Sequence, residues 1–191
     1  MNSRTAKTSS HSGTAVQVGE EIQKVPESLH AKVSEGPSFL HILSKSPIAL
    51  QAYAEAEWAL SKGRLTNKQR EQIALAVAEI NDSDYCLCSH STKARNCGLS
   101  EEDVQLARRA AAVDGKAEAM LRFVQLVTLQ RADIRGVDLR AVLKAGWSEE
   151  EVVEMIANIA LNAFTNYLNR VFGTEAVPVV GPNLASLVPA A

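Results

Sequence analysis

Residues 66–98 read TNKQREQIALAVAEINDSDYCLCSHSTKARNCG, and this stretch predicts two consecutive helices. Thr66 and, three residues later, Gln69 form the pattern of a capping box, which begins a helix. Residues 73–78 leave that helix without a polar face, so we expect it to be buried on all sides. Ser83 is a good N-cap residue and is expected to begin the second helix, which the final glycine of the stretch would end.

Two side chains of the second predicted helix form a candidate reactive site. Cys86 and His90 are four residues apart, so they share one helical face, with roughly 6 Å between their Cβ atoms. At about the third helical position, unpaired backbone N–H groups and the helix dipole favour the thiolate of Cys86, which is the nucleophilic form. His90 can take up the thiol proton or remain as an ion-pair partner. A buried cysteine and a satisfied core histidine are the alternative interpretation.

A carboxylate in the first helix is a third candidate. Glu71 lies on the side continued by Leu75 and Ala78, and a carboxylate on a buried face is uncommon unless it has a partner. The alternative is a favourable charge near a helix N-terminus.

The rest of the chain predicts an all-α protein, because aromatic residues are few, alanines are many, and no run alternates Val, Ile and Thr. Capping patterns and glycines predict the following further helices: 47–59, one from Ser100 to a break near Asp114, 116–131, 137–145 and 149–172. With 191 residues and a net charge of −2, we expect one compact domain. Its expected limits are 25–178, after a disordered tail over 1–24 and before an extended tail over 179–191.

Composition disfavours several classes of function. No basic run with interleaved aromatics suggests nucleic acid, and no apolar stretch approaches the ~20 residues of a membrane span. The first residues lack the apolar core of a secretory signal, and three cysteines make no disulfide framework, so a reducing, cytoplasmic location is expected. Cys86, Cys88 and His90 cannot converge on one metal ion from a single helix. We therefore expect neither a metal nor a cofactor.

The spacing of the candidate residues resembles a known signature. Glu71, eleven residues, Ser83, two residues, Cys86, three residues and His90 resemble the motif of AhpD-like alkylhydroperoxidases, in the carboxymuconolactone decarboxylase family. The resemblance covers roughly residues 40–178 and includes these flanking features: Arg70 beside Glu71, Asn81, Gly98-Leu99-Ser100-Glu101-Glu102 and Asn166-Tyr167-Leu168-Asn169-Arg170.

The resemblance implies a fold and an activity. In that family an all-α bundle assembles into homo-oligomers, and the second cysteine of a Cys-x-x-Cys pair attacks a peroxide. Carried over, Cys86 is the peroxidatic thiol, His90 its base and Glu71 the outer carboxylate of the proton relay. The implied function is a thiol-dependent peroxidase acting on hydrogen peroxide or small alkyl hydroperoxides, as a dimer, trimer or hexamer.

The sequence departs from this pattern at Ser83, where the family has its resolving cysteine. A hydroxyl there can cap the helix or hydrogen-bond the thiolate but cannot form a disulfide. Cys88 is a possible resolving cysteine, although it lies about 200° from Cys86 around an ideal helix. Cys97 is about 16 Å along the axis and too distant for a bridge. An external thiol or dithiol would be sufficient to reduce the sulfenate.

Two other functions stay open on the same residues. One is a decarboxylase-like enzyme that uses His90 and Glu71 as an acid–base pair on a lactone or keto acid. The other is a peroxide sensor that is oxidised once and does not turn over.

Overall fold

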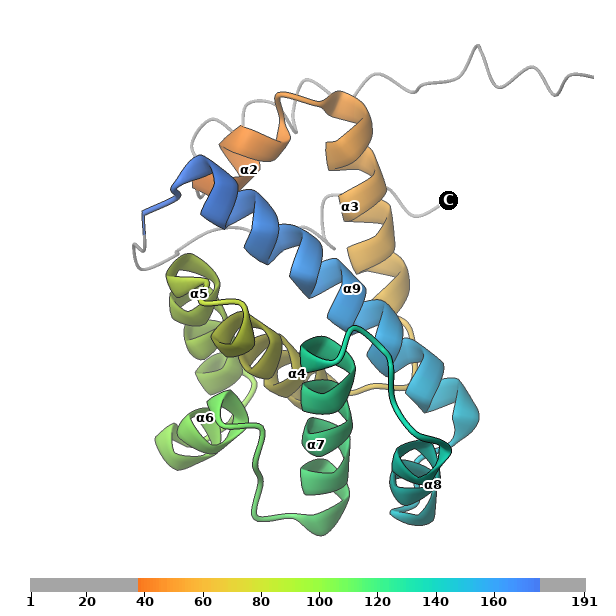
Figure 1. Cartoon of the computed structure of the whole chain (residues 1–191). Coiled ribbons are helices and arrows are strands. Elements are labelled where there is room, and N and C mark those ends of the chain that lie inside the picture. The colour runs from red at the N-terminus through yellow and green to blue at the C-terminus, as the bar shows by residue number, and fades with distance from the viewer. Residues whose placement is uncertain (1–37, 176–191) are drawn as a thin grey trace, which may run out of the picture.

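The computed structural model describes residues 38–175, and within this range it contains eight helices and no strand (Figure 1). The helices are α2 (Ser38–Leu43), α3 (Pro47–Leu60), α4 (Asn67–Ile80), α5 (Asp84–Asn96), α6 (Glu101–Arg108), α7 (Gly115–Leu129), α8 (Gly136–Lys144) and α9 (Glu149–Phe172). The predicted all-α class is confirmed. The expected tails, 1–24 and 179–191, lie outside the described residues.

The helices begin where the sequence predicts, because side chains satisfy the first backbone N–H groups. Capping boxes begin α4, α6 and α9, and the Ser46 side chain accepts from the Ala49 backbone N–H before α3. Helix ends were less predictable. α6 ends at Arg108, several residues before the expected break, and Ala110 just after it takes a left-handed φ of 53°. Helix α2 was not predicted.

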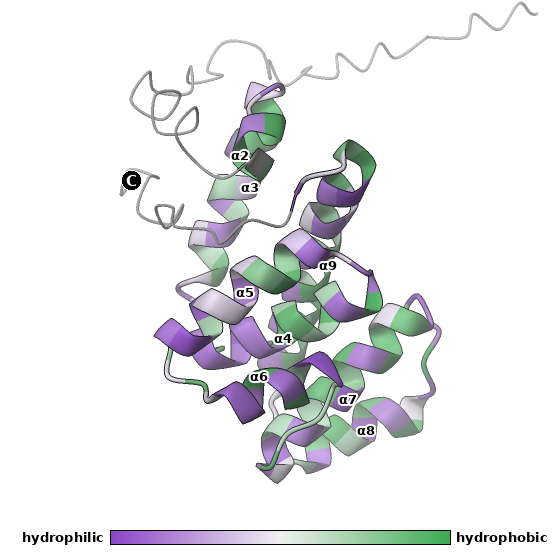
Figure 2. Cartoon of the chain, turned by 90° about the vertical axis from the view of Figure 1, so that its left-hand side faces the viewer, coloured by the Kyte–Doolittle hydropathy of each residue, from purple (hydrophilic) through white to green (hydrophobic). Residues whose placement is uncertain are grey.

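Helix α4 is the centre of the bundle. Residues 73–78 are all buried, as expected for a helix without a polar face. Figure 2 shows α4 among α5, α6, α7 and α9, and it packs against each of them. The largest apolar cluster includes Ile73 and Leu75 from α4, Met120 and Leu121 from α7 and Met155 from α9. Burying α4 on all sides fixes the position of Glu71 in its second turn.

Helices α2 and α3 form a smaller layer against α9 (Figure 1). Leu40, Leu43 and Leu50 are buried in this layer, with Phe39 and Tyr53 packed around them. The Phe39 and Tyr53 rings meet edge to face, with 5.5 Å between their centroids. This layer therefore brings two aromatic side chains towards the beginning of α5.

The turn between α4 and α5 is tied to α9. Asn81 Nδ2 donates to Asn166 Oδ1 at 3.0 Å, and Arg170 donates to the Asn81 carbonyl and forms an ion pair with Asp82 at 3.2 Å. Asp82 takes a left-handed φ of 49°, which the short turn needs. These bonds hold the N-terminus of α5 against the last turns of α9.

Within residues 38–175, no helix is long and apolar enough to cross a membrane.

Candidate active site

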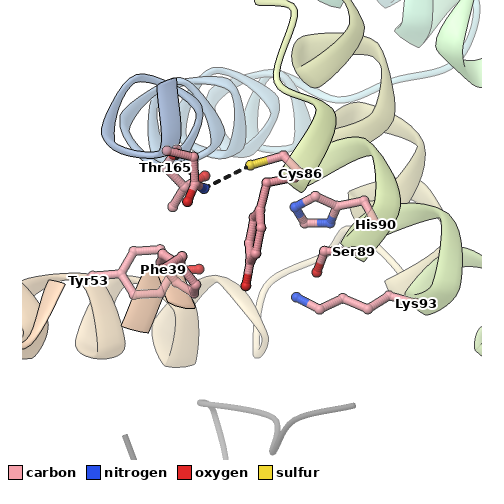
Figure 3. Close-up of a pocket in the computed structure, with 9 residues that line it drawn as sticks. Phe39, Tyr53, Cys86, Ser89, His90, Lys93 and Thr165 are labelled. Atoms are coloured by element: carbon pink, nitrogen blue, oxygen red, sulfur yellow. Dashed lines mark hydrogen bonds between the residues drawn. The ribbon is translucent and has the colours of Figure 1, made fainter. Parts of the chain in front are cut away.

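Cys86 lies in the first turn of α5, as predicted, and is only 3% exposed. Its sulfur accepts a hydrogen bond from Asn169 Nδ2 at 3.2 Å, the dashed line in Figure 3. The same amide nitrogen donates to the Thr165 carbonyl at 2.9 Å. A carbonyl can only accept, so this bond fixes which end of the amide faces the sulfur. Asn169 therefore presents an N–H donor, and not its carbonyl oxygen, to the Cys86 sulfur.

Glu71 and His90 form an ion pair between α4 and α5. The distance from His90 Nδ1 to Glu71 Oε2 is 2.8 Å, and the two side chains are 15% and 17% exposed. Burial by itself raises the pKa of the Glu71 carboxyl, but the charge and hydrogen bond of His90, with Lys93 and Arg70, hold that pKa below its usual 4.5. Glu71 lies beyond the first turn of α4, which contains no acid, and His90 is its partner. Glu71 is therefore not a lone charge at a helix end.

A small cavity joins the thiol to the histidine. Its volume is about 20 Å³, and its lining comes from four helices: Phe39, Tyr53, Tyr85, Cys86, Ser89, His90, Lys93, Thr165 and Asn169. Figure 3 shows Cys86, His90 and Lys93 on one wall and Phe39 and Tyr53 on the other. Among the described residues, no hydrogen bond joins His90 directly to the Cys86 sulfur. The Nδ1 atom of His90 is hydrogen-bonded to Glu71, so Nε2 is the ring nitrogen that can bond a molecule in the cavity.

A second cavity, of about 30 Å³, lies on the other side of the ion pair. Glu71, Arg70 and Glu57 line it, and Tyr53 and His90 line both cavities. Burial, followed by the charges of Glu57 and its other acidic neighbours, raises the pKa of the Tyr53 hydroxyl well above its usual 10.0. Tyr53 therefore stays protonated and can donate a hydrogen bond between the two cavities.

The side chain of Ser83 makes neither of the two hydrogen bonds expected of it. Ser83 occupies the N-cap position of α5, but its hydroxyl makes no capping bond and has no hydrogen-bond partner within the described part of the chain. Its ψ is 86°, whereas the serine that caps α9 has 162°. At that backbone angle the hydroxyl does not reach the N–H groups of the first turn. The donor to the Cys86 sulfur is Asn169 instead.

The other two cysteines are not at the cavity. Cys88 lies on α5 and is partly buried, but neither cavity described above includes it in its lining. Cys97 follows the last residue of α5, at the end opposite Cys86, and burial together with the charge of Glu71 raises the pKa of its thiol. In the part of the chain that the structure describes, the three cysteines form no disulfide.

The main residue that sequence reasoning missed is Asn169. Its stretch was part of the family resemblance, but no role was assigned to it. A signal was present: Asn158, Asn166 and Asn169 lie on the buried side of α9, where amides need hydrogen-bond partners. Phe39, from the unpredicted helix α2, was also missed.

No group of three His, Cys, Asp or Glu side chains able to hold a metal ion occurs between residues 38 and 175.

Comparison with known proteins finds a family match for part of the chain. The sequence model of the carboxymuconolactone decarboxylase family matches residues 46–129, the segment that carries Glu71, Cys86 and His90. This match confirms the resemblance to that family found in the sequence. Among the curated protein sequences compared, none matches this chain.

Solved structures show the same fold. An uncharacterized peroxidase-related protein with an AhpD core, from Ralstonia eutropha JMP134, is 21% identical with a TM-score of 0.72, over 80% of this chain and 87% of that one. A peroxidase-related protein from Silicibacter sp. TM1040 is 18% identical with a TM-score of 0.69, over 79% and 85%. A debrominase in complex with 2,3,4-tribromopyrrole is 17% identical with a TM-score of 0.67, over 79% and 84%. At these identities the likeness establishes the AhpD-like fold alone.

Proposed function

We propose that this protein is a thiol-dependent peroxidase that reduces hydrogen peroxide or small alkyl hydroperoxides through Cys86. The observation that carries the proposal is the buried Cys86 sulfur, hydrogen-bonded by Asn169 at 3.2 Å, in one cavity with the ion-paired His90. A thiolate held by a donor, with a proton source across a small space, is what peroxide reduction needs.

In the first step, the Cys86 thiolate attacks the terminal oxygen of the peroxide. An S–O bond forms, the O–O bond breaks, and sulfur is oxidised by two electrons to the sulfenic acid. The leaving hydroxide or alkoxide takes a proton from Nε2 of protonated His90, the ring nitrogen that does not bind Glu71. Glu71, at 2.8 Å from the other ring nitrogen, stabilises the protonated ring before the transfer and holds its orientation.

In the second step, an external thiol attacks the sulfenic sulfur, water leaves, and a mixed disulfide forms. A second thiol attacks the external sulfur of that disulfide, which restores the Cys86 thiolate and returns a proton to His90. The sum is one hydroperoxide and two thiols converted to an alcohol or water, a further water and a disulfide. Cys88 could replace the first external thiol only if the beginning of α5 unwinds.

The size of the cavity favours a peroxide over a larger substrate. A volume of about 20 Å³ is close to the 10–15 Å³ that one water requires. A lactone or keto acid would need the surrounding side chains to move, which disfavours the decarboxylase-like alternative.

The burial of Cys86 in this cavity favours the peroxide sensor as a second candidate function. With Cys86 at 3% exposure, an external thiol can reach the sulfenate only after local opening. A protein that does not open would be oxidised once and would not turn over.

Peroxide consumption by the purified protein, with and without dithiothreitol, tests the proposal. The variants are Cys86→Ser, Cys88→Ser and, as the matched control at the far end of α5, Cys97→Ser. We expect dithiothreitol-dependent turnover that Cys86→Ser abolishes and Cys97→Ser retains. Full turnover by Cys86→Ser would show that the proposal is wrong. Stoichiometric oxidation of Cys86 without turnover would identify the sensor.

A further inference from the structure

We propose that Tyr53 is a catalytic hydrogen-bond donor, whose hydroxyl bonds the leaving oxygen of the peroxide while the Cys86 thiolate attacks the other oxygen. This inference rests on the proposed function, because it concerns the same cavity and the same reaction. It adds a residue of α3, a helix to which neither the sequence pattern nor the family resemblance assigned a site residue.

Tyr53 lies on the wall of the cavity opposite Cys86 and His90. In Figure 3 its ring lies along that wall beside Phe39, with the hydroxyl turned towards the side chains of α5. The residue is partly exposed along its length, but its hydroxyl is buried, and the charges that act on the hydroxyl include those of Cys86 and Glu71. The hydroxyl is therefore close to both the nucleophile and the ion pair.

Aromatic contacts fix the position of the Tyr53 ring. Its centroid lies 5.5 Å from that of Phe39 on α2, with an angle of 82° between the ring planes, and 6.3 Å from that of Phe164 on α9. Aromatic rings at these separations attract each other, so two neighbouring helices hold the tyrosine in place. A donor that is fixed before the substrate arrives needs no reorganisation during the reaction.

The hydroxyl of Tyr53 is not used within the described part of the chain. None of the hydrogen bonds found among residues 38–175 involves it, whereas the Thr165 hydroxyl and the Asn169 amide, at the same cavity, already have acceptors. A tyrosine hydroxyl in a buried position usually has a hydrogen-bond partner. A molecule bound in the cavity can be that partner.

The direction of the reaction makes the position of Tyr53 useful. The thiolate attacks one oxygen along the O–O bond, so the S–O bond forms on one side of that oxygen while the O–O bond breaks on the other side. The leaving oxygen therefore points away from Cys86, towards the wall that Phe39 and Tyr53 form. Of these two side chains only Tyr53 carries a polar group, so it is the one able to bond the leaving oxygen.

Tyr53 and His90 act differently on that oxygen. Negative charge develops there as the O–O bond breaks, and a fixed donor in a small cavity stabilises it. Burial, followed by the charge of Glu57, raises the pKa of the Tyr53 hydroxyl well above its usual 10.0, so the hydroxyl is a poor acid. It keeps its proton and donates only a hydrogen bond, while the proton that the leaving oxygen receives comes from His90.

Single-turnover oxidation of Cys86 by hydrogen peroxide tests the inference, with Tyr53→Phe as the variant. Phenylalanine keeps the ring and its aromatic contacts and removes only the hydroxyl. We expect the second-order rate constant of oxidation to fall about ten- to hundredfold, the usual effect of one hydrogen bond to a charged group. The matched control is Tyr167→Phe, the same change at an exposed tyrosine outside both cavities, and its rate should stay within about twofold of wild type.

Alkylation of Cys86 by iodoacetamide, followed against pH, separates this role from a structural one. All proteins compared carry Cys88→Ser and Cys97→Ser, so that only the Cys86 thiol reacts. Alkylation uses the same thiolate as peroxide reduction but creates no charge on an oxygen. A donor to the leaving oxygen leaves the alkylation profile of Tyr53→Phe unchanged, whereas a donor to the sulfur, or a change in packing, would shift it.

Each result decides between two conclusions. Equal oxidation rates in wild type and Tyr53→Phe would overturn the inference and leave the proposed function standing. Oxidation and alkylation slowed to the same extent would also overturn it, because Tyr53 would then act on the thiolate or on its access. A wild type whose Cys86 is not oxidised by peroxide would overturn the proposed function and this inference with it.

Discussion

The bond from Asn169 to the Cys86 sulfur can be removed with little change of shape. Asn169→Leu keeps the number of side-chain heavy atoms and their branching but deletes the donor at 3.2 Å from the sulfur. A hydrogen bond to a charged group contributes about 1.5–3 kcal/mol, which corresponds to a roughly ten- to hundredfold lower rate of Cys86 oxidation. The fold should tolerate the change. Asn169 Oδ1 is buried and has no partner among the described residues, so the substitution also removes an unsatisfied acceptor. That gain is offset because leucine is larger than asparagine at this buried site and because the bond to the Thr165 carbonyl is lost. We expect the unfolding free energy to fall by about 1–3 kcal/mol.

Single-turnover oxidation by hydrogen peroxide, followed by trapping of the sulfenic acid and mass spectrometry, measures this rate. The matched control is Asn162→Leu on the same helix, whose amide bonds the Asn158 carbonyl and does not contact the sulfur. Its oxidation rate should stay within about twofold of wild type. If Asn169→Leu oxidised as fast as the wild type, with the fold intact, the assignment of Asn169 as the thiolate donor would be refuted.

Three further predictions follow from the same structure. Because the pKa of Glu71 is lowered in the folded state, its ion pair stabilises the fold above the usual 4.5 and is lost as pH falls through the lowered value. In thermal melts, Glu71→Gln should thus be less stable than wild type near neutral pH, and the gap should close in acid; a gap that persists would contradict the ion pair. Ser83→Cys places a thiol three residues before Cys86, at a spacing that suits a disulfide. Peroxide should then produce that disulfide, detectable by peptide mapping, and its absence would show that the turn is too rigid. Leu75→Ala should cost about 2–5 kcal/mol in urea unfolding because Leu75 is fully buried, whereas a loss below about 1 kcal/mol would mean that α4 is not central.

Local patterns in the sequence determined most of the helical framework. The capping boxes at Thr66, Ser100 and Ser148 are complete within four residues, so they can be recognised without knowing how the rest of the chain packs. The buried run 73–78 was visible because a helix without a polar face must be covered. Cys86 and His90 could be placed on one helix for the same reason: four residues bring two side chains to one face.

Tertiary packing decided what those residues touch. The sequence indicated that Glu71 needs a partner, but only the packing of α4 against α5 shows that the partner is His90. Asn169 reaches Cys86 from 83 positions along the chain, and no local pattern encodes such a contact. Ser83 looked like a cap by residue type, yet in the α4–α5 turn, which α9 holds, its hydroxyl makes no capping bond. Local propensity thus determined where helices begin and which faces are apolar. Which faces meet, and therefore the chemistry of the cavity, depends on how the whole bundle buries them together.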